Sequence, residues 1–357
     1  MTGKKYFMAM ISAAMAGAMV FGGCGAASSE VTSTKSSANV SETSAVQDSS
    51  AVAEQKNYTI GFSAYAMQQE WYQNISAGAE EEAKSLGITL QTVDADTNSA
   101  TQLEAIENFI TQKVDAIIIS PVEADALAPV VKDAEDAGIK VICESNMVDG
   151  ADTVVGISNY EAAYSVGQYF AEYCKENSFT PKMLILGYEA LENCRQRVEG
   201  FKAGMDDAGV EYEVLTEQDG GFREASLTAA TDAFTAHPEI NSVFGINDDS
   251  TIGAVEAAKA LGMDLDAMCA ITYGLEGIAG RTALYNGGAY KFALASFPEA
   301  VGVSCVDAAV AAIEGQELPP QYESPTAIVS QEDFKDYFVQ NGEKWDINFD
   351  KLAELSK

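Results

Sequence analysis

The chain has 357 residues, 47% of them hydrophobic, which is enough apolar material for one large core or two medium ones. This composition excludes a mostly disordered chain, a collagen-like repeat and a disulfide mini-protein. The formal net charge of −33, from 54 acidic and 21 basic residues, argues against binding to nucleic acid or anionic lipid. A single histidine, His237, all but removes His-rich metal sites and Ser–His–Asp catalysis.

Residues 1–23 are predicted to be a signal peptide. Lys4 and Lys5 precede an apolar stretch, Tyr6–Phe21, that is shorter than the ~20 residues needed to span a bilayer. The stretch runs into Val20–Cys24, which resembles a bacterial lipobox although Phe21 stands where Leu is usual. We therefore expect lipidation at Cys24 and a mature chain whose charge changes from −33 to −35 with the loss of two lysines. The alternative is an ordinary secretory signal with an incidental cysteine.

Residues 24–56 are predicted to be a disordered linker. Positions 25–56 hold nine serines, three threonines and no aromatic residue, so they cannot bury enough surface to offset the entropy of ordering. A flexible coil of this length reaches on the order of 30 Å. We expect the folded body to be held near the outer face of a bacterial cell membrane.

Short apolar runs alternate with amphipathic segments from Tyr58 onward. In the first half we predict strands at 59–64, 88–93, 116–119 and 140–143 and helices at 71–86, 100–112 and 124–137. In the second half we predict strands at 154–157, 183–186, 212–215, 242–246, 270–272 and 291–295, and helices at 160–174, 193–208, 223–236, 250–261, 277–285 and 299–314. Repeated βα units indicate an α/β protein with parallel sheets, and this number of strands favours two doubly wound lobes. Ligands of such folds bind beyond the carboxyl ends of the strands.

Two adjacent aromatic residues, Trp71 and Tyr72, follow the first predicted strand. Both cannot point inward from one helix, so at least one is expected to face the cleft. The alternative is that Trp71 packs under the sheet and Tyr72 lies on the surface. Ser120 follows the third strand, and the polar set Glu144–Asn146 follows the fourth, where it suits either hydroxyl hydrogen bonds or a plain turn.

Arg195 and Arg197 are two of only four arginines in the chain, and they lie near the start of one predicted helix. Two positions apart, they face different directions, so only one of them can easily point into a cleft. For Arg197 the alternative is a surface ion pair with Glu192 or Glu199.

Four further strand-end residues belong to the second half. Phe222 either closes over a ligand or staples the helix that follows it. Asn247 offers a donor and an acceptor together, which suits a sugar hydroxyl. Tyr273 and Ser296 come directly after two other apolar runs.

The sequence has no recognisable catalytic constellation, so we expect no enzyme, cofactor or metal. It contains no GxxxxGK, and Gly274, Gly277 and Gly280 have the wrong spacing for a nucleotide loop. His237 is expected at the surface. Five cysteines remain after Cys24, and we expect them to be reduced and mostly buried: Cys143, Cys174, Cys194, Cys269 and Cys305.

From about Tyr58 to Val329 the chain resembles the periplasmic sugar-binding proteins of ABC importers, especially the ribose-binding type. The strings that carry the resemblance, in this order, are WYQNISAGAEEEAKSLG, AIIISP, VEGFKAGM, TAHPEINSVFGINDD and FALASFPEAVG. The resemblance implies a type I periplasmic binding protein fold with three crossings between the lobes, near Ser158, Ser296 and Pro325. Lobe 1 would then combine 57–158 with 297–325, and lobe 2 would combine 159–296 with 326–357, the tail 331–357 being uncertain.

The resemblance also implies roles for individual residues. Trp71 and Tyr72 fall where the family sandwiches a sugar ring, with Gln69 and Tyr65 beside them. Arg197, Phe222 and Asn247 fall on the second-lobe arginine, aromatic and asparagine of the family. Four strand-end positions fall on its other polar contacts: Ser145, Asn146, Tyr273 and Ser296. Ser120 is a further candidate from its place after the third strand alone.

This chain departs from the ribose-binding pattern at three of those places. Ser145-Asn146 stands where the family has Asp-Arg, Tyr273 where it has Asp, and Ser296 where it has Gln. Ribose itself is therefore in doubt, and the sequence favours an aromatic-rich, carboxylate-poor site for a bulkier, less hydroxylated or modified ligand.

The resemblance implies a monomeric, extracytoplasmic, lipid-anchored solute-binding protein that delivers a small ligand, most simply a sugar, to an ABC permease. The alternatives are a ligand sensor for a chemoreceptor or kinase, and a binder of a nucleoside or sugar-derived signal. A secreted enzyme lacks a catalytic constellation here. A related transcription regulator would carry a DNA-binding helix-turn-helix where this chain has a signal and tether.

Overall fold

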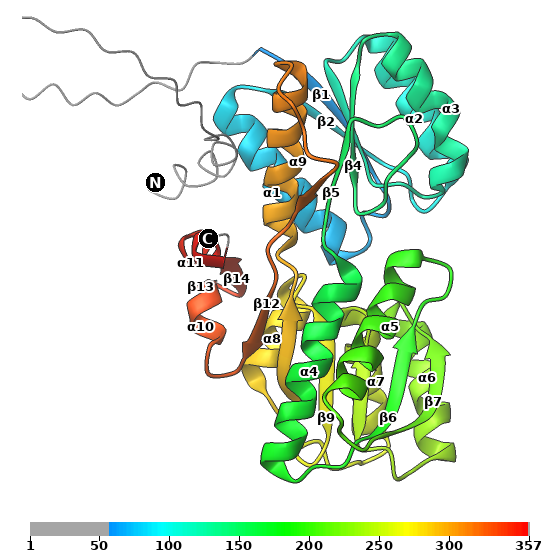
Figure 1. Cartoon of the computed structure of the whole chain (residues 1–357), viewed down its shortest axis with the longest axis vertical. Helices are drawn as coiled ribbons and strands as arrows, with labels where there is room; N and C mark the ends of the chain where they lie inside the picture. Colours follow the sequence, from blue (N-terminus) through cyan, green and yellow to red (C-terminus); the bar gives the residue numbers. More distant parts are fainter. Residues whose placement is uncertain (1–56, 356–357) are drawn as a thin grey trace, which may run out of the picture. The chain divides into compact units, whose positions relative to one another are not determined.

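The computed structural model describes residues 57–355, which are built on two six-stranded sheets (Figure 1). The predicted signal peptide, the lipidation position Cys24 and the linker 24–56 lie outside the described residues. We call the part built on the first sheet lobe 1 and the part built on the second sheet lobe 2.

Lobe 1 is an all-parallel sheet with the strand order β11-β5-β4-β3-β1-β2. Its strands are β1 (Thr59–Ala64), β2 (Thr89–Asp94), β3 (Ala116–Ile119), β4 (Lys140–Glu144), β5 (Thr153–Gly156) and β11 (Gln321–Glu323). Helices α1 (Glu70–Leu86) and α9 (Pro298–Ile313) form one apolar core with the sheet, and α2 (Ser99–Gln112) and α3 (Ala124–Asp136) form another on the opposite face. The continuous apolar run of β3 is buried because helices cover both faces.

Lobe 2 has the strand order β12-β10-β9-β8-β6-β7, in which only β12 is antiparallel. Its strands are β6 (Lys182–Gly187), β7 (Glu213–Asp219), β8 (Ser242–Gly245), β9 (Cys269–Gly274), β10 (Tyr290–Ala295) and β12 (Ala327–Ser330). One face carries α4 (Asn159–Asn177) and α5 (Glu192–Asp207), and the other carries α6 (Arg223–Ala236), α7 (Asp248–Ala260) and α8 (Ile278–Asn286).

The chain passes between the sheets three times: from β5 to α4, from β10 to α9 and from β11 to β12. At the second passage Phe297 adopts a left-handed backbone conformation, with φ of 46°, and caps the start of α9. Because the passages leave and enter at the strand ends, the carboxyl edges of both sheets lie next to the connections.

The predicted α/β architecture with two doubly wound lobes is confirmed, and every strand and helix predicted between 59 and 314 is present. The boundaries differ most at β7, which continues to Asp219. Its last residues, Thr216–Asp219, are polar because β7 is an edge strand whose outer part faces solvent. Apolar periodicity alone could not detect that extension.

Helices α1 and α9 pack with their backbones in close contact. A Cβ added to Gly302 would lie 2.0 Å from the carbonyl oxygen of Ile75, and one added to Gly78 would lie 2.1 Å from that of Glu299. Glycine at these two positions therefore brings the start of α1 against the helix that follows the second passage between the lobes.

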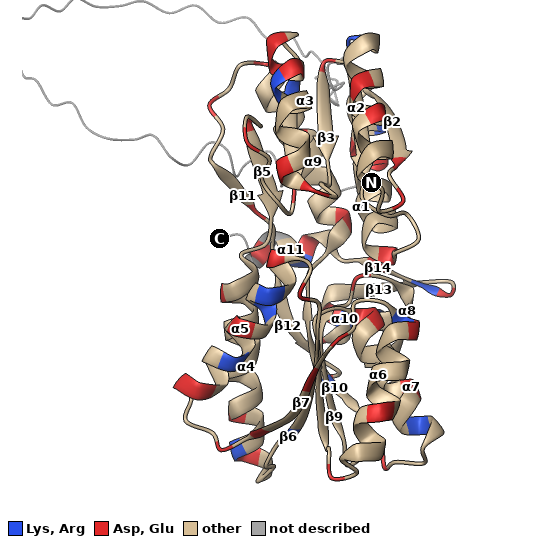
Figure 2. Ribbon diagram, turned by 90° about the vertical axis from the view of Figure 1, so that its right-hand side faces the viewer, with Lys and Arg blue, Asp and Glu red and all other residues tan. Residues whose placement is uncertain are grey.

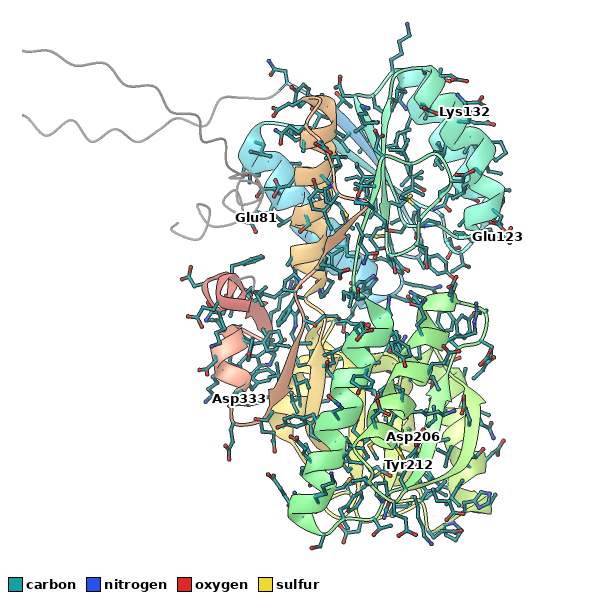
Figure 3. The ribbon with its side chains drawn as sticks, in the orientation of Figure 1. Glu81, Glu123, Lys132, Asp206, Tyr212 and Asp333 are labelled. Carbon is teal, nitrogen blue, oxygen red and sulfur yellow. The ribbon has the colours of Figure 1, made fainter. Side chains whose placement is uncertain are left out.

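The tail, residues 331–357, continues into lobe 2 as far as the structure describes it. It forms α10 (Phe334–Tyr337), β13 (Phe338–Asn341), β14 (Lys344–Ile347) and α11 (Phe349–Leu355). Asp333, labelled in Figure 3, accepts a hydrogen bond from Ser330 Oγ (2.8 Å) at the turn into α10. The tail completes the core on the α6–α8 face with Phe334, Phe338, Trp345, Ile347 and Leu352.

The tail also contacts the second passage between the lobes. The ring of Phe297 lies 6.1 Å from that of Tyr337 and 5.9 Å from that of Phe338. Arg281 of α8 donates to the carbonyl oxygen of Trp345 (2.7 Å) and forms a salt bridge with Glu299 of α9 (2.8 Å). One guanidinium thus joins lobe 2, the tail and the first turn of an α9 that packs on lobe 1.

Within residues 57–355, none of the helices combines the length and the apolar character that a bilayer crossing needs.

We predict that Phe338→Ala lowers the free energy of unfolding by about 3–5 kcal/mol, because it empties a fully buried ring site at the junction of tail and core. Urea unfolding followed by circular dichroism measures the effect. The matched control is Val339→Ala in the same strand, whose side chain is 53% exposed and should change stability by less than about 0.5 kcal/mol. Equal losses from the two variants would show that the tail is not part of the lobe 2 core.

Candidate functional site

The first turn of α1 places aromatic residues between the two lobes. Gln69 is the extended N-cap residue of α1, and Trp71 packs against the apolar cores of both lobes. Tyr72 is half-buried and its ring stacks on that of Tyr65, with 5.4 Å between centroids and 26° between planes. Burial and the nearby Glu144 raise the pKa of Tyr72 well above 10. The alternative that Tyr72 is a surface residue is therefore wrong.

Arg197 is buried at the carboxyl edge of lobe 2, so the alternative of a surface ion pair is also wrong. Its Nε donates to Asn159 Oδ1 and its Nη1 to the carbonyl oxygen of Ile246, both at 2.8 Å. The guanidinium lies 4.0 Å from the ring centre of Tyr273, and the Tyr273 hydroxyl donates to the same Asn159 oxygen at 3.1 Å. These contacts tie α4, α5, β8 and β9 into one polar cluster.

Asn159 is a functional candidate that the sequence reasoning missed. It is the first residue of α4, directly after the first passage between the lobes, and it is 5% exposed. Its Oδ1 accepts from both Arg197 and Tyr273, so it holds the two side chains in place. A polar residue at a helix start beside a lobe connection is the signal that could have identified it.

Three of the predicted lobe 2 residues are engaged within their own lobe. Asn247 caps α7, with its Oδ1 accepting from the Ser250 amide and its Nδ2 donating to the Gly221 carbonyl oxygen, both at 2.9 Å. Ser296 is fully buried and donates to the Gly274 carbonyl oxygen at 3.1 Å. The ring of Phe222 meets that of Tyr188 edge-on at 6.1 Å. Asn247 and Ser296 therefore use their polar groups to hold the strand-end loops.

Ser145 and Asn146 lie where the lobes meet on the side of β4. Ser145 has φ of 67°, and its Oγ accepts a hydrogen bond from Asn193 of α5 at 3.2 Å. Both residues line a cavity of about 370 Å³ together with Ser158, Asn159 and Tyr160 of the first connection and α4. This cavity is built from residues of both lobes.

A second set of contacts joins α1 to the start of α8. Glu70 Oε2 accepts from the Ala279 amide at 3.2 Å, which places a carboxylate at the positive end of a helix of the other lobe. Asn74 Nδ2 donates to the Glu276 carbonyl oxygen at 2.5 Å. Gly277 permits this approach, because a Cβ there would lie 2.5 Å from Glu70 Oε2. The two lobes are thus joined directly by side chains at their facing edges.

Glu144, the last residue of β4, belongs to the polar set 144–146 that the sequence places after the fourth strand, although the sequence reasoning did not name it as a ligand residue. It is 1% exposed, and alternation along β4 places it on the same sheet face as Ile142, below α1 and α9. Both carboxyl oxygens, and the neighbouring Ser120 Oγ, are buried and make no well-formed hydrogen bond within the described residues, although Ser120 and Trp71 lie near the carboxyl group as weak donors. Burial raises the Glu144 pKa to about 7, although Ser120, Trp71 and Arg197 each act to lower it.

Carboxyl groups lie at the facing edges of both lobes, whereas the sequence favoured a carboxylate-poor site. Besides Glu144, Asp248 and Glu276 lie at the edge of lobe 2. Asp248 accepts from Thr272 Oγ1 and the Leu275 and Glu276 amides, and burial raises its pKa to about 6. Burial first, and then the charge of Asp248, raise the pKa of Glu276 well above 4.5.

The remaining chemistry-bearing groups do not form a separate site in the described part of the chain. All five cysteines after Cys24 are buried and free. No group of His, Cys, Asp and Glu side chains within residues 57–355 is arranged to hold a metal ion. The candidate site is made of aromatic, amide, guanidinium and carboxyl groups.

We predict that Glu144→Gln stabilises the ligand-free protein by roughly 3 kcal/mol near pH 8 and by much less near pH 5. A carboxyl whose folded-state pKa is raised from 4.5 to about 7 costs nothing below the unfolded value. Its cost grows as the pH rises through that interval and is complete above the folded value, whereas Gln carries no charge. Urea unfolding at the two pH values measures the difference.

The matched control is Glu81→Gln, because Glu81 is exposed on α1 (Figure 3). It should give no pH-dependent gain. A Glu144→Gln variant that is no more stabilised near pH 8 than near pH 5 would contradict the buried, unpartnered carboxylate.

Comparisons with known proteins agree with this architecture. Residues 60–317 match the family model described as a periplasmic binding protein domain. The ribose import binding protein of Bacillus subtilis is 25% identical over 279 residues, 77% of this chain and 88% of that protein. A putative rhizopine-binding protein of Rhizobium meliloti is 28% identical over 292 residues, 79% of this chain and 93% of that protein.

Solved structures show the same fold. An ABC transporter periplasmic solute-binding protein from Actinobacillus succinogenes with bound D-allose has a TM-score of 0.73 and 25% identity, and the match covers 79% of this chain and 100% of that one. A solute-binding protein from Bacillus halodurans with bound myo-inositol has a TM-score of 0.69 and 23% identity, covering 80% and 98%.

The family match spans most of the two lobes and ends at residue 317, before β11, β12 and the tail. The relatives are solute-binding proteins and not enzymes. The chain therefore belongs to the periplasmic binding protein domain family.

Proposed function

We propose that this protein is an extracytoplasmic solute-binding lipoprotein that captures a sugar, or a closely related polyol, between two closing lobes and delivers it to an ABC permease. The observation that carries the proposal is the position of Trp71, which packs on both lobes where the carboxyl edges of the sheets meet. The relatives whose names state a sugar or polyol ligand support the same class of ligand.

Binding would work by closure. A ligand that contacts both edges favours the state in which they are together, and it shifts the equilibrium only by its differential affinity for that state. The Glu70–Ala279 and Asn74–Glu276 hydrogen bonds support closure, because each has one partner in each lobe. Their loss on opening would leave an amide, a carbonyl and two side chains to water.

Ring faces and polar groups would divide the recognition between them. The rings of Trp71, Tyr72 and Tyr65 offer apolar faces to the C–H faces of a sugar. Ser145, Asn146 and Asn193 line or border the cavity between the lobes and offer hydrogen-bonding groups to its rim. Arg197 would act mainly through what it holds, since two of its nitrogens already bond Asn159 and Ile246.

Anchoring and delivery are further parts of the proposal. The pattern Val20–Cys24 and the polar segment that follows it support a lipidated Cys24 and a tether. The family supports an extracytoplasmic location and a permease partner, and we propose that a monomer serves both. The strongly acidic balance, with red positions spread over both lobes in Figure 2, is in keeping with a body that is not held to anionic lipid by charge.

The experiment is isothermal titration calorimetry of the purified protein against a panel of pentoses, hexoses and cyclitols. We expect at least one to bind with a dissociation constant at or below roughly the micromolar range, about −8 kcal/mol. Trp71→Leu should weaken that binding by roughly tenfold or more, and Trp71→Phe, which keeps a ring, should restore most of it. Absence of binding to every member of the panel would overturn the sugar or polyol ligand.

The chain offers a matched control in its other tryptophan, Trp345 in the tail. Trp345→Leu should lower the unfolding midpoint, because the side chain is 6% exposed in the lobe 2 core, and should leave affinity unchanged. Loss of affinity in this variant equal to that of Trp71→Leu would mean that general destabilisation, not the ring at the cleft, explains the effect.

Lipidation has its own test. We expect the full chain, expressed in a bacterium fed with radiolabelled palmitate, to carry the label and to fractionate with membranes. Cys24→Ser should abolish both properties, whereas Cys174→Ser, which alters a buried thiol of α4, should retain them. If the Cys24→Ser variant still carried the label, Cys24 would not be the lipidation site, and an ordinary secretory signal would explain the N-terminal sequence better.

A further inference from the structure

We propose that the cleft selects a ligand with a protonated amine beside its hydroxyls, such as an amino sugar or an aminocyclitol, and that Glu144 is the residue that recognises the amine. This inference rests on the proposed function, because it specifies the class of polyol that the same cleft takes. It follows from which charged side chains between the lobes have hydrogen-bond or ion-pair partners and which do not.

Glu144 is a charged group without a counterpart. Its two carboxyl oxygens are buried and make no well-formed hydrogen bond within residues 57–355, and the same holds for the Ser120 hydroxyl beside it. Ser120 and Trp71 lie near enough to lower the Glu144 pKa as weak donors, but neither brings a positive charge. Buried charges in proteins are ordinarily paired and hydrogen-bonded, because an unpaired one is costly. Two adjacent unpartnered polar side chains at a strand-end edge therefore point to a partner that arrives with the ligand.

The groups around Glu144 come from five elements or loops. Trp71 and Tyr72 approach from α1, and Ser120 follows β3. Cys143 precedes Glu144 in β4 and Cys305 faces it from α9, both as buried thiols. Arg197 acts on it from α5 of the other lobe. Among these residues the positive charge comes from Arg197 alone.

Arg197 does not neutralise Glu144. Its Nε and Nη1 donate to Asn159 and Ile246, and its plane lies over the Tyr273 ring. No ion pair joins it to Glu144 in the part of the chain that the structure describes. The guanidinium is thus committed to neutral groups of lobe 2, and it lowers the pKa of Glu144 only as the last of the causes that act on it.

The opposite edge of the cleft adds further negative charge. There, Asp248 is satisfied by the backbone amides of Leu275 and Glu276, whereas Glu70 of lobe 1 reaches across to the amide of Ala279. The half-buried carboxylate of Glu276 has no hydrogen bond or ion pair that the described residues supply. Carboxylates on both edges therefore remain available to a cation held between them.

The aromatic residues suit the same ligand. Trp71 lies close enough to Glu144 to influence its pKa, and the stacked pair of Tyr72 and Tyr65 begins next to it. The faces of such rings attract ammonium groups as well as sugar C–H faces. A protonated amine placed between these rings and Glu144 would therefore be stabilised both by the ring faces and by the carboxylate.

A neutral hydroxyl would satisfy Glu144 less well than an amine. A hydroxyl donates one hydrogen bond and leaves the negative charge buried, whereas an ammonium donates up to three and removes the net charge. Burial holds the Glu144 pKa at about 7 in the absence of a ligand. Below that pH an arriving ammonium must displace the carboxyl proton, so binding should weaken as the pH falls and should release a proton.

The test compares matched pairs by calorimetry on the mature protein: D-glucosamine with D-glucose, D-galactosamine with D-galactose, and an aminocyclitol with the corresponding cyclitol. We expect at least one amine to bind roughly tenfold or more tightly than its hydroxyl partner near pH 7.5, and this advantage to shrink near pH 5.5. Titrations in buffers of different ionisation enthalpy should show proton release near pH 6 that the wild type has and Glu144→Gln lacks.

Variants separate recognition from folding. Glu144→Gln is isosteric and uncharged, and it should remove the preference for the amine while keeping weak binding of both partners. Glu81→Gln, on the exposed face of α1, should keep the wild-type preference. Because removal of a buried charge should not unfold the protein, a cooperative melting curve for Glu144→Gln confirms that the change lies in recognition.

The outcomes are distinguishable. Hydroxyl members that bind as tightly as their amines, or an amine preference that survives Glu144→Gln, overturn this inference and leave the proposed function standing. No binding by any amine or hydroxyl member overturns the proposed function and the inference together.

Discussion

Three passages of the chain between two sheets constrain everything else at the site. They place the carboxyl edges of the two sheets opposite each other, and the side chains of the candidate site lie at or next to those edges. Residues that follow the carboxyl end of a parallel strand lie in loops outside the apolar core, so polar side chains there can face a ligand without disturbing the core. The direct Glu70–Ala279 and Asn74–Glu276 contacts follow from the same constraint, because they join loops that the topology brings together.

The two edges solve the problem of buried charge differently. On lobe 2, Arg197 and Asp248 each make hydrogen bonds to neighbouring groups. These bonds hold α4, α5, β8, β9 and the loop after β9 in place. On lobe 1, Glu144 is almost fully desolvated, and its oxygens make no well-formed hydrogen bond and no ion pair within the described residues. The polar groups of lobe 2 are thus held in place, whereas Glu144 of lobe 1 has no charged partner in the described part of the chain. Closure of the lobes without a ligand would leave this carboxylate unpaired, so the arrangement favours closure around a ligand.

The tail gives the second passage a rigid boundary. Phe338 and Tyr337 pack on Phe297, and Arg281 links Trp345 to Glu299 at the start of α9. Since α9 also packs backbone to backbone on α1 through Gly302, the aromatic residues of α1 are connected to the tail through one continuous set of close contacts. Rigid packing of this kind limits the directions in which the lobes can move relative to the tail.

The sequence by itself determined the order and type of the elements. Apolar periodicity and the glycine or polar residues at helix ends are local signals, so they can be recognised without knowing which elements pack together. It also identified the strand ends as the places to inspect, and the cluster of Trp71, Tyr72 and Arg197 was found in that way. The tertiary structure decided which polar residues are buried and what they contact. Glu144 has an ordinary place in a strand and Asn159 an ordinary place at a helix start. Their importance comes from contacts with α1, α5 and α9, which lie far away in the sequence. The tail could be assigned to lobe 2 only from the contacts of its aromatic rings with Phe297 and the core beside α8.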